Sequence, residues 1–197
     1  MARVRRRDGR VWLGGVEKLN WGKANTFAGA LFEALKTTGH RYAYHEIMGL
    51  TGLAFRSRWC NDETKTRWCP SCAIGEMPDE EALVRRLMGV GLATEWIEPE
   101  GRDNEALRAR IVAAVDGGKP VLAYSPGLDM GVVYGYENGG GTLLVSDYAT
   151  DEFPARLPVA KLGPVQVYLG DGERPPSLRD TCLEALKVAV RNWRRDV

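Results

Sequence analysis

Long apolar runs are absent from this chain of 197 residues. No stretch of about 18 apolar residues could span a bilayer, and no apolar segment follows the basic opening MARVRRRDGR to form the middle of a signal peptide. Neither sign of charge is in excess, since 27 Lys and Arg oppose 26 Asp and Glu. This balance argues against a nucleic-acid-coating protein. We therefore expect a soluble cytoplasmic protein with no membrane and no nucleic-acid partner.

Histidine and cysteine are also scarce, which limits the chemistry open to the chain. There are two histidines, His40 and His45, and four cysteines. The stretch WGKANTFAGAL, residues 21–31, reads as the start of a helix suited to a nucleophile, yet it contains no cysteine, serine or histidine. An unassisted threonine hydroxyl is not ionised at neutral pH, so Thr26 would need a separate base to act as a nucleophile.

What the sequence does contain is helical periodicity early and strand patterns late. Phe27, Leu31 and Leu35 share one face of a helix that begins at Thr26 and ends at Gly39. Helices are also predicted at Tyr44–Leu50, Pro78–Gly89, Asn104–Val115 and Leu178–Trp193, and strands at Leu92–Ile97, VLAYS, GVVYGYE, TLLVSDY and PVQVYL. This order predicts an α+β fold, and the length predicts a single domain covering residues 1–197.

Four segments need separate predictions. Residues 1–10 form a basic arm that we expect to be solvated, with phosphate or anionic-surface binding as the alternative. Residues 51–78 form a long loop rich in tryptophan and cysteine, whose length indicates a function or a constraint. The segment from Phe153 to Pro164 is predicted to be a connection between strands. Residues 177–197 contain the last helix, whose predicted inward residues are Cys182, Leu186, Ala189, Val190 and Trp193.

Two motifs resemble the papain-like cysteine peptidases. They are the helix entrance WGKANTFAGAL and the later hairpin GVVYGYENGGGTLLVSDY. The closer likeness is to the bacterial C39-like peptidase group and the related butirosin-biosynthesis acyltransferase family. In such proteins a glutamine precedes by six residues a cysteine that opens the central helix. A histidine lies six residues before the glycine of a Gly-Tyr pair, and an Asp or Asn ends the next strand. The helix dipole lowers the pKa of the thiol, and the histidine takes its proton.

Carried over to this chain, the motif shows that the reacting groups have been replaced. The glutamine position holds Asn20, the cysteine position Thr26, the histidine position Asp129 and the acidic position Asp147. The resemblance therefore implies a papain-like fold, with a central N-terminal helix packed on an antiparallel sheet, in a catalytically degenerate member. A second resemblance, to a bacterial group of unassigned activity, rests on residues 49–56, GLTGLAFR.

The leading function that the sequence predicts is ligand binding without catalysis. We expect a small-molecule or peptide-like ligand between the start of the first helix and the Asp129/Asp147 hairpin. An aspartate pair beside a helix start suits a cationic group or acid–base work. The residues expected to bind are Asn20, Trp21, Asn25, Trp59 and Trp68. The simpler interpretations are that Asn25 or Thr26 only caps the helix, that the aspartates serve a turn and a strand end, and that the tryptophans pin the loop.

Two further functions stay open on the sequence alone. The first is a hydrolase or acyltransferase that uses Thr26 with an acidic partner. The second is a zinc- or thiol-dependent regulatory module built on Cys60, Cys69 and Cys72, because Cys69 and Cys72 have the spacing of a zinc knuckle or a redox pair. A fourth zinc ligand would have to be His40, His45 or Asp62. A single Cys-x-x-Cys pair is a weak signal, so we expect no cofactor.

Overall fold

The structure is a computed structural model that describes residues 3–20, 22, 25–55, 89–97, 103–126, 129–171 and 174–195. The predicted helix Pro78–Gly89 lies outside these residues, apart from its last residue. So does the loop predicted at 51–78, except for its first five residues. Those five include a short 3-10 helix, η1 (Leu53–Phe55), at the start of the predicted structured loop.

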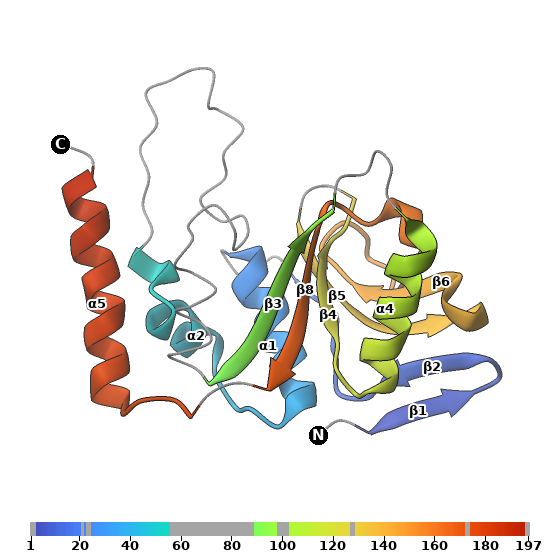
Figure 1. Cartoon of the computed structure of the whole chain (residues 1–197), viewed down its shortest axis with the longest axis horizontal. Coiled ribbons are helices and arrows are strands. Elements are labelled where there is room, and N and C mark those ends of the chain that lie inside the picture. The colour runs from blue at the N-terminus through green and yellow to red at the C-terminus, as the bar shows by residue number, and fades with distance from the viewer. Residues whose placement is uncertain are drawn as a thin grey trace, which may run out of the picture.

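Among the described residues, eight strands form one antiparallel sheet (Figure 1). Its order is β1-β2-β5-β4-β8-β3, and β6 pairs with β5 and with β7. The strands are β1 (Val4–Arg7), β2 (Arg10–Leu13), β3 (Val90–Trp96), β4 (Val121–Tyr124), β5 (Met130–Glu137), β6 (Thr142–Ser146), β7 (Ala155–Leu157) and β8 (Val165–Asp171). All residues of β4 and nearly all of β5 are buried, because helices cover both faces of this part of the sheet.

The helices lie on both sides of the sheet. Figure 1 shows α1 (Thr26–Thr38) on one side and α4 (Asn104–Asp116) on the other. On the α1 side, α2 (Tyr44–Leu50) and then α5 (Leu178–Arg195) follow outward from the sheet. Short 3-10 turns cover Asn138–Gly140 and Val159–Lys161. No helix among the described residues has the length and apolar character needed to cross a membrane.

The prediction of an α+β fold with the first helix packed on an antiparallel sheet is confirmed. Helix α1 begins at Thr26 and ends before Gly39, whose φ of 89° provides the expected left-handed cap. Phe27, Leu31 and Leu35 are fully buried, as their spacing predicts. The predictions for α2 and α4 and for strands β3, β4, β5, β6 and β8 also hold within a few residues.

The basic N-terminal arm is mostly exposed, as predicted, but it is part of the sheet and not an irregular terminus. Residues 4–13 form the β1–β2 hairpin, and β2 continues the sheet by pairing with β5. The turn is Asp8-Gly9, in which both residues have positive φ, 49° and 74°. An Asp-Gly pair between two strands is a strong hairpin signal, because it adopts a turn whose twist matches that of the strands. This signal was missed because the many arginines of the segment are typical of a charged terminal tail.

A second correction concerns the segment from Phe153 to Pro164, which was predicted to be only a connection. It contains β7, which pairs with β6 through Leu143↔Leu157 and Val145↔Ala155. The strand has three residues and follows a proline, so it gives almost no periodic signal.

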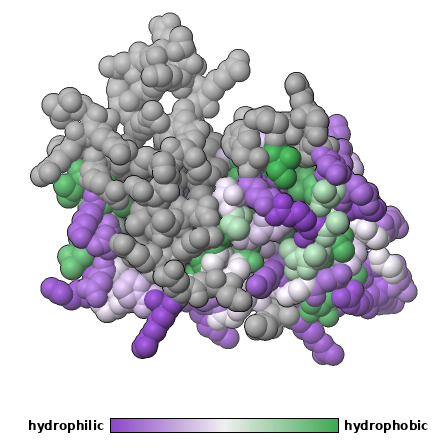
Figure 2. All heavy atoms as spheres, viewed as in Figure 1, coloured by the Kyte–Doolittle hydropathy of each residue, from purple (hydrophilic) through white to green (hydrophobic). Residues whose placement is uncertain are grey.

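The inward face of the last helix was also predicted wrongly. Among the α5 side chains that the structure describes, Thr181, Ala185 and Val188 are buried, whereas Cys182 is exposed and Leu186 and Val190 are about half exposed. The side chain of Trp193 lies outside the described residues. Figure 2 shows apolar side chains at the surface along the left edge of the molecule, where Figure 1 places α5. Close packing explains why Val188 faces inward. It lies against Gly52, where an added Cβ would come within 3.0 Å of the valine side chain.

Candidate functional site

The start of α1 is held by its own cap and by α2. Asn25 has an extended backbone, and its side-chain Oδ1 accepts a hydrogen bond from the Ala28 N–H at 2.8 Å. This confirms the simpler prediction that Asn25 is the N-cap. The Asn25 N–H donates in turn to the Tyr44 hydroxyl at 3.0 Å. The chain therefore reverses after Gly39 and brings the beginning of α2 back to the beginning of α1.

Thr26 is the first residue of the helix and lies against the start of β5. Its side chain is buried, and its Oγ1 accepts a hydrogen bond from the Met130 N–H at 3.4 Å. Met130 directly follows Asp129, the residue at the position that the resemblance assigns to the base. The structure therefore brings Thr26 and the Asp129 segment together across about a hundred residues of sequence, as predicted.

Asp129 closes the connection between β4 and β5. Its carbonyl accepts the Ser125 N–H at 3.0 Å and the Ser125 hydroxyl at 3.3 Å, which confirms a turn role for its backbone. Partial burial raises the pKa of its carboxyl group, and the nearby Asp147 raises this pKa further. Both aspartates belong to the same end of the β5–β6 hairpin, since Asp129 precedes β5 and Asp147 follows β6.

Asp147 follows β6 directly and is buried. Its Oδ1 accepts the Thr150 N–H at 3.3 Å, which is the strand-end role considered from the sequence. The strand beside it holds Gly131, where an added Cβ would lie 3.2 Å from the Cβ of Asp147 and 2.9 Å from the Ser146 carbonyl oxygen. A glycine is therefore needed to let the two strands approach at this end of the hairpin.

The segment before α1 is fixed to the same place. The buried Ser146 hydroxyl accepts the Leu19 N–H at 2.9 Å and donates to the Glu17 carbonyl at 2.7 Å. Lys18 Nζ donates to the Asp147 carbonyl oxygen at 2.6 Å. Asn20, at the position that the resemblance assigns to the glutamine, is exposed, and its side chain accepts the Gly22 N–H at 3.1 Å. Hydrogen bonds thus fix the backbone before Asn20 at the site. The side-chain oxygen of Asn20 only accepts a hydrogen bond within its own turn.

Sequence reasoning missed two tyrosines at this site. Tyr148 is buried, and burial raises the pKa of its hydroxyl, with Tyr44, Asp129 and Glu33 adding smaller effects in the same direction. Tyr44 is also the group that accepts the Asn25 N–H. A usable signal existed for Tyr148, since it directly follows Asp147, but nothing in the sequence links Tyr44 to the helix start. The described surroundings of Thr26 are therefore acidic and phenolic.

The two histidines are placed elsewhere on the α1–α2 pair. The ring of His40 stacks on Tyr42 with centroids 6.3 Å apart, beyond the C-terminal end of α1. His45 is exposed on α2. Thr26 starts a helix of 13 residues, about 20 Å long, so His40 lies at the opposite end from the Thr26 hydroxyl. Asp129, in contrast, directly precedes the residue whose N–H the Thr26 hydroxyl accepts.

Several predicted site residues lie outside the described part of the chain. They are Trp21, Trp59 and Trp68 among the expected binding residues, and Cys60, Cys69 and Cys72 among the possible zinc or thiol residues. Within the described ranges, no group of three or more His, Cys, Asp or Glu side chains could hold a metal ion. The binding and metal predictions for these residues therefore stay predictions.

The chain is similar to known proteins in its structure and not in its sequence. No protein-family model matches the chain, and no curated protein matches it. Among solved structures, the chain is similar to a double glycine motif protease from an AMS/PCAT transporter, solved in complex with the leader peptide. The sequence identity is 11% and the TM-score 0.47, and the match covers 86% of this chain and 93% of that one.

Proposed function

We propose that the protein is a catalytically degenerate papain-like protein that binds a ligand at the start of α1, between Thr26 and the Asp129/Asp147 pair. The ligand is a small molecule or a peptide-like compound that carries a cationic group. The observation that carries this proposal is the placement of two aspartates beside the helix start: Met130, next to Asp129, donates its N–H to the Thr26 hydroxyl, and Asp147 lies against Gly131 of the same strand.

Electrostatics favours a cation at this place. Two carboxylates that repel one another are both stabilised when a positive charge comes between or beside them. A guanidinium or ammonium group would also form charge-assisted hydrogen bonds with the carboxylates, which are stronger than neutral ones. Asp129 is only partly buried, so a ligand can reach it from solvent.

Binding is a better proposal than hydrolysis because of what surrounds Thr26. The threonine hydroxyl accepts the Met130 N–H, and the nearest inherited base position holds a carboxyl group in place of an imidazole. A carboxylate is a far weaker base than a hydroxyl nucleophile requires, so proton transfer from Thr26 is unfavourable. The backbone arrangement of an active site can thus serve as a binding site when the catalytic side chains have been replaced.

Calorimetry with matched ligands tests the proposal. Arginine amide and glycyl-glycine amide carry a cationic group, and N-acetylglycine amide does not. We expect the first two to bind and the third to bind at least about tenfold more weakly, since a charge-assisted hydrogen bond contributes about 1.5–3 kcal/mol. Asp129→Asn should weaken the cationic ligands by a similar factor, whereas Thr26→Ser should keep them.

Asp151→Asn is the matched control, because Asp151 is exposed and lies only four residues after Asp147. It removes one negative charge from the same region and should change affinity by less than about twofold. Equal losses in Asp129→Asn and Asp151→Asn would point to a general effect of net charge and would contradict a specific site.

The second candidate function is a hydrolase or acyltransferase that uses Thr26 with Asp129. It is favoured by the hydrogen bond that places the Thr26 hydroxyl beside the residue following Asp129. This function requires turnover of an amide or ester substrate that is lost in Thr26→Ala. Turnover that survives this substitution would rule it out, and ligand binding without turnover would leave the first proposal standing.

A further inference from the structure

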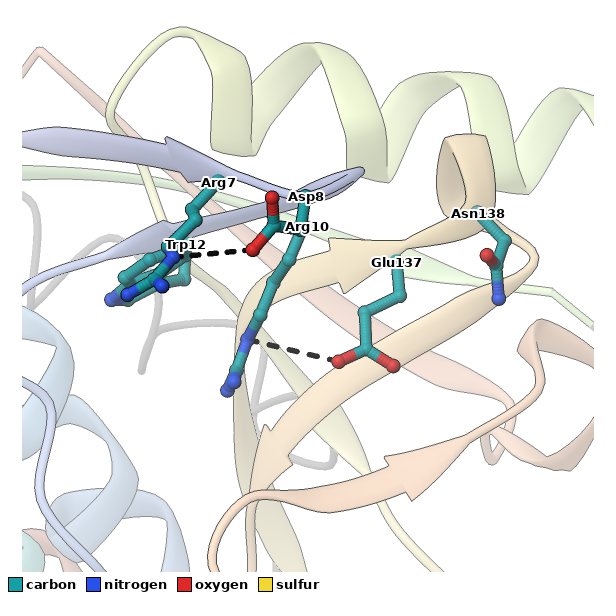
Figure 3. Close-up of a pocket in the computed structure, with 6 residues that line it drawn as sticks. All are labelled: Arg7, Asp8, Arg10, Trp12, Glu137 and Asn138. Carbon is teal, nitrogen blue, oxygen red and sulfur yellow. Dashed lines mark hydrogen bonds and ion pairs between the residues drawn. The ribbon is translucent and has the colours of Figure 1, made fainter.

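A separate pocket of about 570 Å³ lies at the other end of β5. It is lined by Arg7, Asp8, Arg10, Trp12, Glu137 and Asn138 (Figure 3). Strand β5 runs for eight residues from Met130, beside Thr26, to Glu137, which puts the pocket about 23 Å from the Thr26 site. Its volume is within the usual range for a site that holds a small molecule.

The register of the hairpin gathers the lining residues on one face of the sheet. Arg7 pairs with Arg10, and Arg10 pairs with Glu137 on the neighbouring strand, so all three side chains project from the same face. Arg5 pairs with Trp12 and adds a further guanidinium on that face. Figure 3 shows the side chains of Arg7, Arg10, Trp12 and Glu137 extending from the same side of their strands.

The lining holds two arginines and two carboxylates, and Arg156 adds a third guanidinium group beside Glu137. Both oxygens of Glu137 accept hydrogen bonds from Arg156, at 3.2 and 3.4 Å. Arg10 Nε stays 3.7 Å from Glu137, and among the described residues this buried nitrogen has no hydrogen-bond partner. Arg7 pairs with its neighbour Asp8, where both side chains are more than four-fifths exposed. Such an exposed pair contributes little, so Arg7 can exchange Asp8 for another anion.

Trp12 gives the pocket an apolar wall. Its ring is half-buried, and the Cζ of Arg10 lies 5.2 Å from the ring centroid. The contact holds the Arg10 guanidinium beside the indole by a cation–π interaction. Two arginine forks next to a flat aromatic surface suit a ligand in which an anionic group is joined to a flat ring. Arginine binds phosphate oxygens with two parallel hydrogen bonds, which a compact ammonium cannot do.

We propose that this pocket binds a small phosphorylated molecule with a flat ring, as in a mononucleotide. Arg7 and Arg10 hold the phosphate group, and Trp12 and Asn138 contact the rest of the ligand. The competing explanation is that the arginines only protect the edge strand β1 from pairing with other chains, because charged side chains are common on exposed sheet edges. That explanation requires no ligand.

Calorimetry with three probes tests the proposal: adenosine 5′-monophosphate, inorganic phosphate and adenosine. We expect the nucleotide to bind most tightly, inorganic phosphate to bind more weakly, and adenosine to show no saturable binding at millimolar concentration. Arg7→Ala should weaken nucleotide binding by at least about tenfold, and Arg10→Lys, which keeps the charge but loses the fork, should weaken it too. Raising the salt concentration should lower the affinity.

Arg6→Ala is the matched control. Arg6 lies on the same strand but projects from the opposite face, where it pairs with Asp116 at 2.8 Å. Its loss removes the same charge and should leave nucleotide affinity unchanged within about twofold. The proposal is overturned if the nucleotide shows no saturable binding, if adenosine binds as tightly as the nucleotide, or if Arg6→Ala weakens binding as much as Arg7→Ala. Each of these results would leave the arginines with the role of protecting the edge.

Discussion

Asp129 is the residue at the candidate site whose ionisation opposes folding. Burial and the charge of Asp147 raise its pKa above the ordinary value of 3.8, so the folded protein binds a proton more readily there than the unfolded chain does. The free energy of unfolding therefore contains an unfavourable contribution from Asp129. This contribution is absent well below pH 3.8 and grows as the pH rises toward and through the raised pKa.

Replacing Asp129 with asparagine tests this directly. Asp129→Asn should make the protein at least as stable as the parent at pH 7, with an advantage that shrinks as the pH falls toward 3.8. Urea unfolding of both proteins at a series of pH values measures the difference. Asp151→Asn is the control, because it removes an exposed aspartate from the same region. A parent that gains stability relative to Asp129→Asn as the pH rises would show that the Asp129 carboxylate has a favourable partner in the folded state.

At this scale the sequence predicted the site in part. Thr26, Asp129 and Asp147 could be named because each holds a fixed distance from a recognisable element: the helix entrance, the Gly135-Tyr136 pair and the end of a strand. Tyr44 could not be named in the same way. Its role depends on how the chain turns between α1 and α2, which no local pattern specifies.

The β1–β2 hairpin is the element whose turn can be tested most simply. Gly9 has a φ of 74°, and an added Cβ would meet no atom within 4 Å. Gly9→Ala should therefore lower the free energy of unfolding by about 1 kcal/mol through backbone strain alone, since a left-handed conformation costs an L-residue roughly that much. Thermal or urea unfolding measures the change.

Gly49→Ala is the control for Gly9→Ala. Gly49 lies in helix α2 without positive φ, and a Cβ there would also meet open space. Alanine is the better helix former, so this variant should gain about 0.5 kcal/mol. A neutral or stabilising effect of Gly9→Ala would mean that the Asp8-Gly9 turn does not hold its left-handed conformation in solution.

Elements were predictable where one face is buried and the periodicity is strong. Helix α4 buries Leu107, Ile111 and Val115, as their spacing of four predicts. In α5 the same rule failed, because the helix docks through small residues that approach η1 and α2 closely. Hydrophobicity selects Leu186 and Val190, whereas the structure buries Ala185 and packs Val188 beside Gly52. Packing geometry decided this face, and a single sequence does not carry that information.

Strand β5 extends from one proposed site to the other. It pairs with β4 near Met130, with β2 near Glu137 and with β6 along most of its length. A register shift at Val133/Gly135 separates the two halves of the strand. The Thr26 site and the arginine pocket therefore lie at opposite ends of one strand. The strands β2, β4 and β6 all pair with it directly.

Gly135 is the point on β5 where an added methyl group should disturb the molecule as a whole. A Cβ there would lie 2.6 Å from the Val11 carbonyl oxygen, 2.8 Å from the Cβ of Trp12 and 2.9 Å from Leu144. Backbone cannot move aside as a flexible side chain can, so β2 must separate from β5. We expect Gly135→Ala to lower the free energy of unfolding by about 1–3 kcal/mol, the range for overpacking a close-packed interior.

Hydrogen exchange shows how far this disturbance spreads. In Gly135→Ala the amides of β2 should lose protection, and nucleotide binding at the arginine pocket should weaken because Arg10 and Trp12 move with that strand. Gly14→Ala is the control, since its Cβ would meet the flexible end of the Arg5 side chain at 3.1 Å, which can shift at little cost. If Gly135→Ala were as stable as Gly14→Ala, β2 could not lie as close to β5 as the register requires. Arg10 and Trp12 of β2 would then not line the same pocket as Glu137 of β5.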